Sequence, residues 1–256
     1  MRSDIEWKKW GQVDPLFSRA PWPGQKEPPG QAWSEQAVFA LGESDWADCC
    51  RVWRQYGLSV ENCFEIGCGP GRMTRYLMHT FSEVHASDVS PDQIALAQRY
   101  CDPAHVMFHL TEGVNLPVPD ESISAVFSVY VFQVFDLHSD AASYFQQIHR
   151  VLVPGNGTLM IQLPVHEWPS SGLFLKFWRG TYAAKRTLGD MRAAYQRFWI
   201  RRGQFRPLRR TISYEVAWLF STLASLGFKD VELRTFCLSS NPEPHTFVFA
   251  RKAPAA

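Results

Sequence analysis

The glycine-rich stretch FEIGCGPGR at residues 64–72 constrains the fold of this chain more than any other feature. It places Gly67, Gly69 and Gly71 directly after a short apolar run. Glycine lets a backbone turn sharply and lets a ligand approach the main chain closely. When such a turn leads into a helix, free N–H groups at the helix N-terminus are available to the ligand. We therefore expect a strand, a tight turn and a helix that together form a binding site.

Short apolar segments alternate with helical segments on both sides of this turn. We predict strands at 63–66, 84–87, 106–110, 123–130, 158–163, 231–236 and 246–250. We predict helices at 73–81, 91–101, 141–152 and 213–226, and an earlier one from Ser44 or Asp45 to Gly57. Strands separated by helices form a mostly parallel sheet that is covered on both faces. The link CLSSNPEPH at 237–245 is rich in turn residues and predicts that the last two strands are antiparallel.

The composition indicates one α/β domain with additions. A chain of 256 residues with 46% hydrophobic residues can bury a substantial core. No apolar run reaches the roughly 18 to 20 residues of a membrane span, and the N-terminus lacks a secretory signal, so we expect a cytoplasmic protein. The six cysteines form no CxxC pair and no zinc-like spacing with histidine, so we predict no metal site.

The charge is distributed unevenly along the chain. Residues 165–210 contain eleven Lys/Arg against Glu167 and Asp190, which gives +9 and leaves −8 for the rest of a chain of net charge +1. Aromatic residues such as Trp178 and Tyr182 lie among these cations. The segment fits a solvated basic face, a grip on an anionic acceptor, or peripheral contact with an anionic membrane. A sequence pI near 7.7 argues against nucleic acid as the partner.

The glycine loop departs from the dinucleotide fingerprint GxGxxG, because Arg72 occupies the position of its third glycine. EIGCGPG at 65–71 instead resembles motif I of the class I S-adenosylmethionine-dependent methyltransferases, in particular those of the small bacterial type. The resemblance continues through 84–98, 111–133 and 149–164, in order and in spacing. It implies a Rossmann-like fold with a seven-stranded, mostly parallel sheet whose last strand is antiparallel and whose two faces carry helices. It also implies S-adenosylmethionine as cofactor and S-adenosylhomocysteine as product.

The resemblance assigns the cofactor residues. Asp88 ends the second strand, where a carboxylate can accept both ribose hydroxyls. Glu65 is implied to face the amino group of the methionine moiety, Glu112 with Gly113 beside it to face the adenine amino group, and Val89 with Leu116 to clamp the adenine. The full cofactor set is Glu65, Gly67, Cys68, Gly69, Gly71, Asp88, Val89, Glu112, Gly113 and Val129.

Candidates for the acceptor side follow the fourth and fifth strands. Methyl transfer is an in-line displacement that depends on positioning, and a base helps when the acceptor is a hydroxyl. His138 and His166 are candidate bases, while Tyr130 and Gln133 are candidates to orient the acceptor. The family's usual acidic residue at the start of the fourth strand and its histidine after Phe132 and Gln133 are both absent from this sequence.

We divide the chain into an N-terminal cap at 1–44, a cofactor-binding core at 45–164, a basic helical lid at 165–212 and a C-terminal part of the core at 213–256. Trp10 and Phe39 are candidates to cap the sites. The expected activity is methyl transfer to an oxygen or nitrogen of a small-molecule acceptor that is free, carrier-linked or lipid-linked, and anionic on one interpretation of the basic segment. The alternatives are a catalytically inactive cofactor-binding regulator or partner protein and, third, a nicotinamide-dependent oxidoreductase. The oligomeric state is not predicted.

Overall fold

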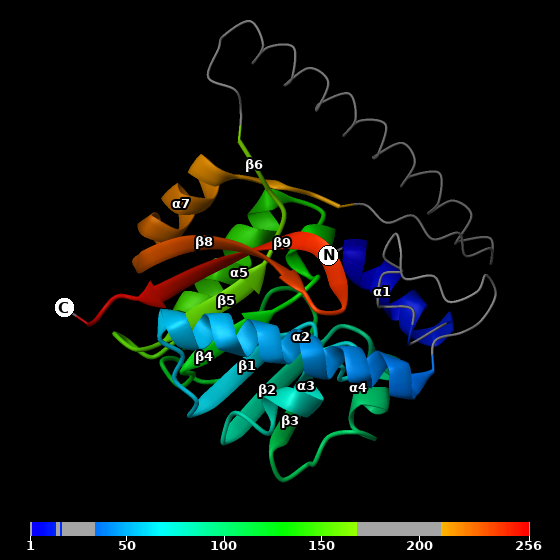
Figure 1. Cartoon of the computed structure of the whole chain (residues 1–256). Helices are drawn as coiled ribbons and strands as arrows, with labels where there is room; N and C mark the ends of the chain where they lie inside the picture. The colour runs from blue at the N-terminus through cyan, green and yellow to red at the C-terminus, as the bar shows by residue number, and fades with distance from the viewer. Residues whose placement is uncertain (1, 14–15, 17–33, 168–210, 256) are drawn as a thin grey trace, which may run out of the picture.

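The central feature of the computed structural model is a seven-stranded sheet (Figure 1). The structure describes residues 2–13, 16, 34–167 and 211–255. The strand order is β3-β2-β1-β4-β5-β9-β8. Strand bounds are β1 Asn62–Ile66, β2 Glu83–Asp88, β3 Val106–Leu110, β4 Ala125–Ser128, β5 Thr158–Gln162, β8 Phe228–Leu238 and β9 Asn241–Lys252. β9 is antiparallel to β5 and β8, whereas β1 to β5 pair in parallel. The predicted fold class is confirmed.

Helices bury both faces of this sheet. Their bounds are α1 Arg2–Val13, α2 Glu35–Tyr56, α3 Thr74–Leu77, α4 Pro91–Ala97, η1 Phe132–Val134, α5 His138–Val151 and α7 Val216–Ser225. One core cluster joins α5 and α7 to residues such as Phe64 and Val126. The other joins α2 and α3 to residues such as Phe127, on which Trp53 of α2 stacks at 6.0 Å. Side chains that alternate along each strand therefore supply two cores, one on each face.

The long helix α2 begins ten residues before the predicted start. Ser34 is its N-cap and accepts a hydrogen bond from the Ala37 amide at 3.2 Å, and Gly57 at φ 112° ends it as predicted. The prediction of a start at Ser44 or Asp45 is wrong, because Asp45 is buried against distant parts of the chain rather than capping its own helix. The helix therefore runs without interruption across the boundary that we predicted at residue 44.

Two other predicted elements differ from the structure. The predicted link at 237–245 is a tight turn at Ser239 and Ser240, with Pro242 and Pro244 inside β9. β5 pairs with β9 only at residues 247–251. The two prolines therefore lie in the part of β9 that pairs with β8 alone, where fewer backbone N–H donors are needed. The predicted helical lid begins instead with β6, Val165–His166, which pairs in parallel with β7, Tyr214–Glu215. The rest of that segment, 168–210, lies outside the described residues.

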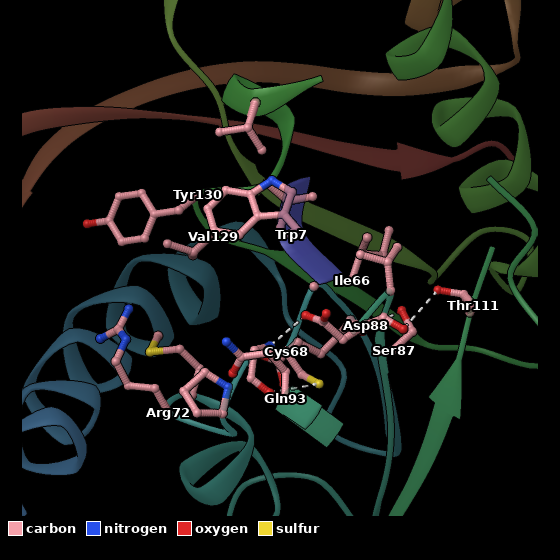
Figure 2. A pocket seen from close by; sticks show the side chains of 18 of the residues that line it. Trp7, Ile66, Cys68, Arg72, Ser87, Asp88, Gln93, Thr111, Val129 and Tyr130 are labelled. Carbon is pink, nitrogen blue, oxygen red and sulfur yellow. Dashed lines mark hydrogen bonds between the residues drawn. The ribbon is translucent and has the colours of Figure 1, made fainter. Parts of the chain in front are cut away.

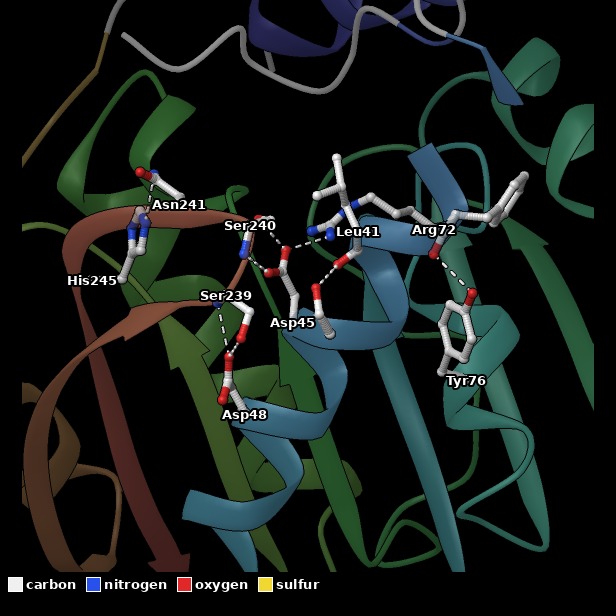
Figure 3. A network of polar contacts seen from close by, with 11 residues as sticks. Leu41, Asp45, Asp48, Arg72, Tyr76, Ser239, Ser240, Asn241 and His245 are labelled. Atoms are coloured by element: carbon white, nitrogen blue, oxygen red, sulfur yellow. Dashed lines mark hydrogen bonds and ion pairs between the residues drawn. The ribbon is translucent and has the colours of Figure 1, made fainter. Parts of the chain in front are cut away.

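A buried carboxylate connects α2 to both the glycine turn and the β8–β9 turn (Figure 3). Asp45 accepts hydrogen bonds from Arg72 Nη1 at 2.6 Å, from the Ser240 amide at 3.0 Å and from Ser240 Oγ at 2.7 Å. Gly42 lies one turn earlier, and a Cβ there would stand 2.2 Å from the Arg72 carbonyl oxygen. The side chain of Arg72 is thus held by Asp45, and its backbone packs against Gly42 of the same helix.

Replacing Asp45 with Asn should lower the free energy of unfolding by about 3 kcal/mol, because the Arg72 guanidinium stays buried without its counter-charge. Urea unfolding at pH 7 measures this change. Glu232→Gln, which removes a half-exposed ion pair with Arg234, is the control and should change stability by less than about 0.5 kcal/mol. A loss below about 1 kcal/mol for Asp45→Asn would contradict the predicted contribution of the Asp45–Arg72 pair to stability.

Candidate functional site

A pocket opens at the carboxyl ends of β1, β2 and β4, beneath α1 (Figure 2). The glycine turn forms one wall, and residues that follow β2 and β4 form others. Trp7 of α1 projects over the cavity, with Asp88 and Cys68 on the opposite side (Figure 2). In an open parallel sheet this is the edge at which ligands bind.

The backbone of the glycine turn explains why glycine occurs there. Gly67, Gly69 and Gly71 have φ values of 74°, 53° and 84°, which L side chains rarely adopt. A Cβ on Gly67 would also stand 2.2 Å from Val131 Cγ2. The Gly67 and Cys68 amides donate to the Ser87 carbonyl oxygen at 2.8 and 2.9 Å, which ties the turn to the end of β2.

Glu65 is a buried carboxyl group at the end of β1, and it lines the pocket. It accepts a hydrogen bond from Thr74 Oγ1 at 2.6 Å. Burial raises the pKa of Glu65 to about 7, although the Thr74 hydrogen bond and the Arg72 charge act in the opposite direction. Near neutral pH this group therefore changes charge readily, and a bound cation would favour its ionised form.

Asp88 is a second carboxyl group that lines the pocket, and it is partly buried at the end of β2. Its Oδ2 accepts from the Gly69 amide at 2.9 Å, and its Oδ1 accepts from the Ser90 amide at 2.9 Å. Burial raises the pKa of Asp88, while these backbone hydrogen bonds lower it. The carboxylate thus stands between the glycine turn and the start of α4, directed by fixed backbone donors.

The assigned cofactor residues divide into two groups in the structure. Those that line the pocket are Glu65, Gly67, Cys68, Gly69, Asp88, Val89 and Val129. Gly71, Glu112 and Gly113 are not among its lining residues. The Glu112 side chain is 81% exposed and pairs with Lys8 Nζ at 2.7 Å, while Gly113 offers its carbonyl oxygen to the Tyr144 hydroxyl at 2.9 Å. Leu116 is buried in the core instead.

The acceptor-side candidates also separate. Tyr130 lines the pocket, with φ 66° and its amide donating to Gln162 Oε1 at 3.0 Å. Gln133 is outside the lining, and its backbone oxygen accepts from the Ile212 amide at 2.8 Å.

His138 and His166 meet at Ser213, outside the lining residues of the pocket. His138 Nε2 donates to the Ser213 carbonyl oxygen at 2.9 Å, and His166 Nδ1 lies 2.9 Å from Ser213 Oγ. Burial lowers the pKa of His166. Through these contacts the start of α5 and strand β6 are both connected to Ser213, the residue before β7.

The residues that α1 contributes to the pocket were not predicted from the sequence. Ser3, Asp4 and Trp7 line the pocket, whereas the proposed caps Trp10 and Phe39 are buried outside its lining. A signal was available, because Asp4, Trp7 and Gly11 recur at helical spacing and share one face.

The described residues contain no group of three or more His, Cys, Asp or Glu residues arranged to hold a metal ion. Among the helices of that part of the chain, none has the length and apolar character needed to cross a membrane.

Comparison with known proteins gives consistent matches. Residues 64–161 match the family model described as "Methyltransferase domain". A malonyl-[acyl-carrier protein] O-methyltransferase from Hahella chejuensis is 34% identical over 104 residues, which span 38% of this chain and 36% of that protein. The match therefore extends over about a third of the relative's length.

Solved structures resemble almost the whole chain. Magnesium protoporphyrin IX methyltransferase from Synechocystis PCC 6803, with bound S-adenosylhomocysteine, has a TM-score of 0.58 at 14% identity, covering 98% of this chain and 100% of that one. N-methyltransferase NodS from Bradyrhizobium japonicum WM9 has a TM-score of 0.58 at 15% identity, covering 98% and 99%. The [4+2]-cyclase SpnF has a TM-score of 0.57 at 17% identity, covering 99% and 97%. At such identities the likeness shows the fold alone.

Glu65 should make the stability of the protein depend on pH. Its folded-state pKa of about 7 exceeds the ordinary value of 4.5, so the folded protein binds this proton more tightly than the unfolded chain. The stabilisation is complete below about pH 4.5 and is lost as pH rises through about 7. Relative to Glu65→Gln, the free energy of unfolding should fall by about 3 kcal/mol between pH 5 and pH 8.

Urea unfolding of both proteins at four pH values in this range measures the effect. The exposed Glu61 supplies the control, because Glu61→Gln should change the free energy of unfolding by the same amount at every pH. If the free energy of unfolding changes with pH in the same way for wild type and Glu65→Gln, then Glu65 binds its proton equally well in the folded and the unfolded state, and the prediction is wrong.

Proposed function

We propose that this protein, whose residues 64–161 match the methyltransferase-domain family model, transfers a methyl group from S-adenosylmethionine to a carboxylate oxygen of a small or carrier-linked acceptor. The observation that supports the proposal best is the placement of two carboxyl groups, the buried Glu65 and the partly buried Asp88, on either side of the glycine turn in one pocket.

The residues of the pocket fit this cofactor chemically. The glycine turn provides a surface without side chains, where a Cβ at Gly67 would clash with Val131. Glu65 is positioned to accept from an ammonium group, and Asp88 to accept from a pair of hydroxyls. These two groups match the methionine amino group and the ribose of S-adenosylmethionine.

S-adenosylmethionine supplies a methyl group on a positively charged sulfur, and displacement by an oxygen nucleophile leaves a neutral thioether. The chain itself has to hold the acceptor oxygen in line with the carbon–sulfur bond and keep water away. Val129, Tyr130 and Val131 follow β4 at the side of the pocket where an acceptor would enter. Their largely apolar surfaces suit exclusion of water, with the Tyr130 ring as a positioning surface.

A carboxylate acceptor suits the polar groups that the described residues provide. His138 and His166 both have a ring nitrogen engaged with Ser213, outside the pocket lining, which does not favour proton removal from a bound hydroxyl. A carboxylate has already lost its proton at neutral pH, so its methylation depends on positioning alone. The excess of cations in 165–210 also favours an anionic acceptor. The name of the Hahella relative, an O-methyltransferase for a malonyl carrier protein, points in the same direction.

Wild-type protein should bind S-adenosylhomocysteine with micromolar affinity in isothermal titration calorimetry. Asp88→Ala removes an acceptor of two hydrogen bonds and should weaken binding about 10- to 100-fold, and Gly69→Asp should abolish it by adding a side chain and a charge. Asp92→Ala is the matched control, since Asp92 is exposed in the first turn of α4. Binding of NADH in place of S-adenosylhomocysteine would refute the proposal.

Incubation with methyl-labelled S-adenosylmethionine should place the label on malonyl-pantetheine as a base-labile methyl ester. His138→Ala and His166→Ala should each change kcat less than about threefold, because no proton has to be removed. Label on an amine of a matched aminoacyl-pantetheine would favour nitrogen as the acceptor. Donor binding with no transfer to acceptors of either class would favour the inactive regulator.

A further inference from the structure

We infer that Asp4, carried by the N-terminal helix α1, is the carboxylate that receives the adenine 6-amino group of the donor, in the place expected for Glu112. This inference rests on the proposed function and assigns part of its donor site to a segment outside the methyltransferase-matched residues 64–161.

Helix α1 is attached to the rim of the pocket at three points along its length. The Ser3 amide donates to Asp136 Oδ2 at 2.9 Å, beyond the end of β4. Lys8 pairs with Glu112, beyond the end of β3. Gly11 packs so closely on the residue that caps α4 that a Cβ there would stand 2.1 Å from Ser90 Oγ. The helix therefore crosses the pocket above β2, with Asp4 and Trp7 between its attachments.

Asp4 is buried, at 9% exposure, and lines the pocket. Its neighbours define which end of the pocket it serves. Asp88 and Tyr144 line the same pocket as Asp4. Burial is the main cause that raises the pKa values of these two groups, and the charge of Asp4 adds to it. Tyr144 in turn donates to the Gly113 carbonyl oxygen, in the loop that follows β3. Asp4 thus belongs to the β2–β3 side, whereas Glu65 lies at the end of β1.

The donor site needs an acceptor on this side. The adenine 6-amino group carries two N–H donors, and a buried donor without a partner costs about 1–3 kcal/mol. Asp88 is already matched to the ribose. Glu112 has an 81% exposed side chain and is paired with Lys8. The helix that holds Glu112 away from the pocket is therefore the one that brings Asp4 into it.

Trp7 is one turn further along the same face and projects over the cavity (Figure 2). An indole face can stack on a purine, which is worth about 1–3 kcal/mol per base in other complexes. Asp4 and Trp7 together would contact the edge and the face of one base. The two residues are three positions apart on α1, so their side chains share one face of the helix.

Calorimetry with two ligands tests the role of Asp4. S-adenosylhomocysteine presents the 6-amino donor, and S-inosylhomocysteine replaces it with an acceptor oxygen. Wild type should bind the adenosyl ligand at least about tenfold more tightly, and Asp4→Asn should lose about tenfold for that ligand alone, which removes the preference. Asp4→Glu keeps the carboxylate and should keep the preference even if affinity falls.

Two variants serve as controls. Ile5→Ala changes a 69% exposed neighbour on the same helix, and Glu112→Gln changes the exposed partner of Lys8. Both should preserve the wild-type preference between the two ligands, and thermal unfolding without ligand checks that each variant folds. If Asp4 only stabilises the first turn of α1, Asp4→Asn will weaken both ligands equally and the inference is wrong.

The possible failures can be distinguished. Wild type that binds neither ligand would overturn the proposed function itself. Wild type that prefers S-adenosylhomocysteine, together with Asp4→Asn that keeps this preference, would overturn only the role of Asp4. Loss of the preference in Glu112→Gln would return the adenine amino group to Glu112.

Discussion

The buried ion pair between Asp45 and Arg72 holds together the parts of the chain on which the pocket depends. Asp45 comes from the middle of α2, Arg72 from the residue after the glycine turn, and Ser240 from the turn between β8 and β9. Arg72 therefore does more than break a dinucleotide pattern. Its guanidinium fixes one end of the glycine turn, and its carbonyl oxygen packs where Gly42 leaves room for it. The carboxylate of Asp45 therefore holds the β8–β9 turn and the glycine turn of the pocket together.

Local patterns predict the parallel sheet and the glycine turn because local physics determines them. Apolar runs such as 63–66 form buried strands, and only glycine adopts the backbone of Gly67, Gly69 and Gly71 without strain. The start of α2 was missed for the opposite reason. Asp45 resembles an N-cap when its neighbours alone are considered, but its partners Arg72 and Ser240 are 27 and 195 residues away. The antiparallel pairing of the last two strands was predicted, but their length was underestimated, because the prolines of β9 resemble a loop until the limited pairing with β5 is known.

The contrast between local patterns and contacts with distant residues also applies to the pocket. The ends of β1 and β2 place Glu65 and Asp88, so a strand prediction was sufficient to bring them together. Glu112 follows β3 directly, yet its ion pair with Lys8, 104 residues earlier, keeps it at the surface. Asp4 and Trp7 lie outside every motif of the core, and their helical spacing is the only local signal that they share a face. Residues that reach the pocket from a separate helix depend on tertiary contacts that no local pattern encodes.

The charges of the pocket bear on which form of the cofactor it holds. Asp4, Glu65 and Asp88 are three acidic residues that line one cavity. Asp4 and Glu65 are buried and Asp88 is partly buried, and burial raises the pKa values of Glu65 and Asp88. A cation in their midst relieves this cost, since opposite charges attract more strongly in a site of low dielectric constant than in water. On the proposed function, the donor brings a sulfonium and an ammonium group, and the product keeps only the ammonium. Methyl transfer thus removes one favourable interaction from the pocket, so the acidic lining favours the donor over the product by the attraction of the sulfonium charge.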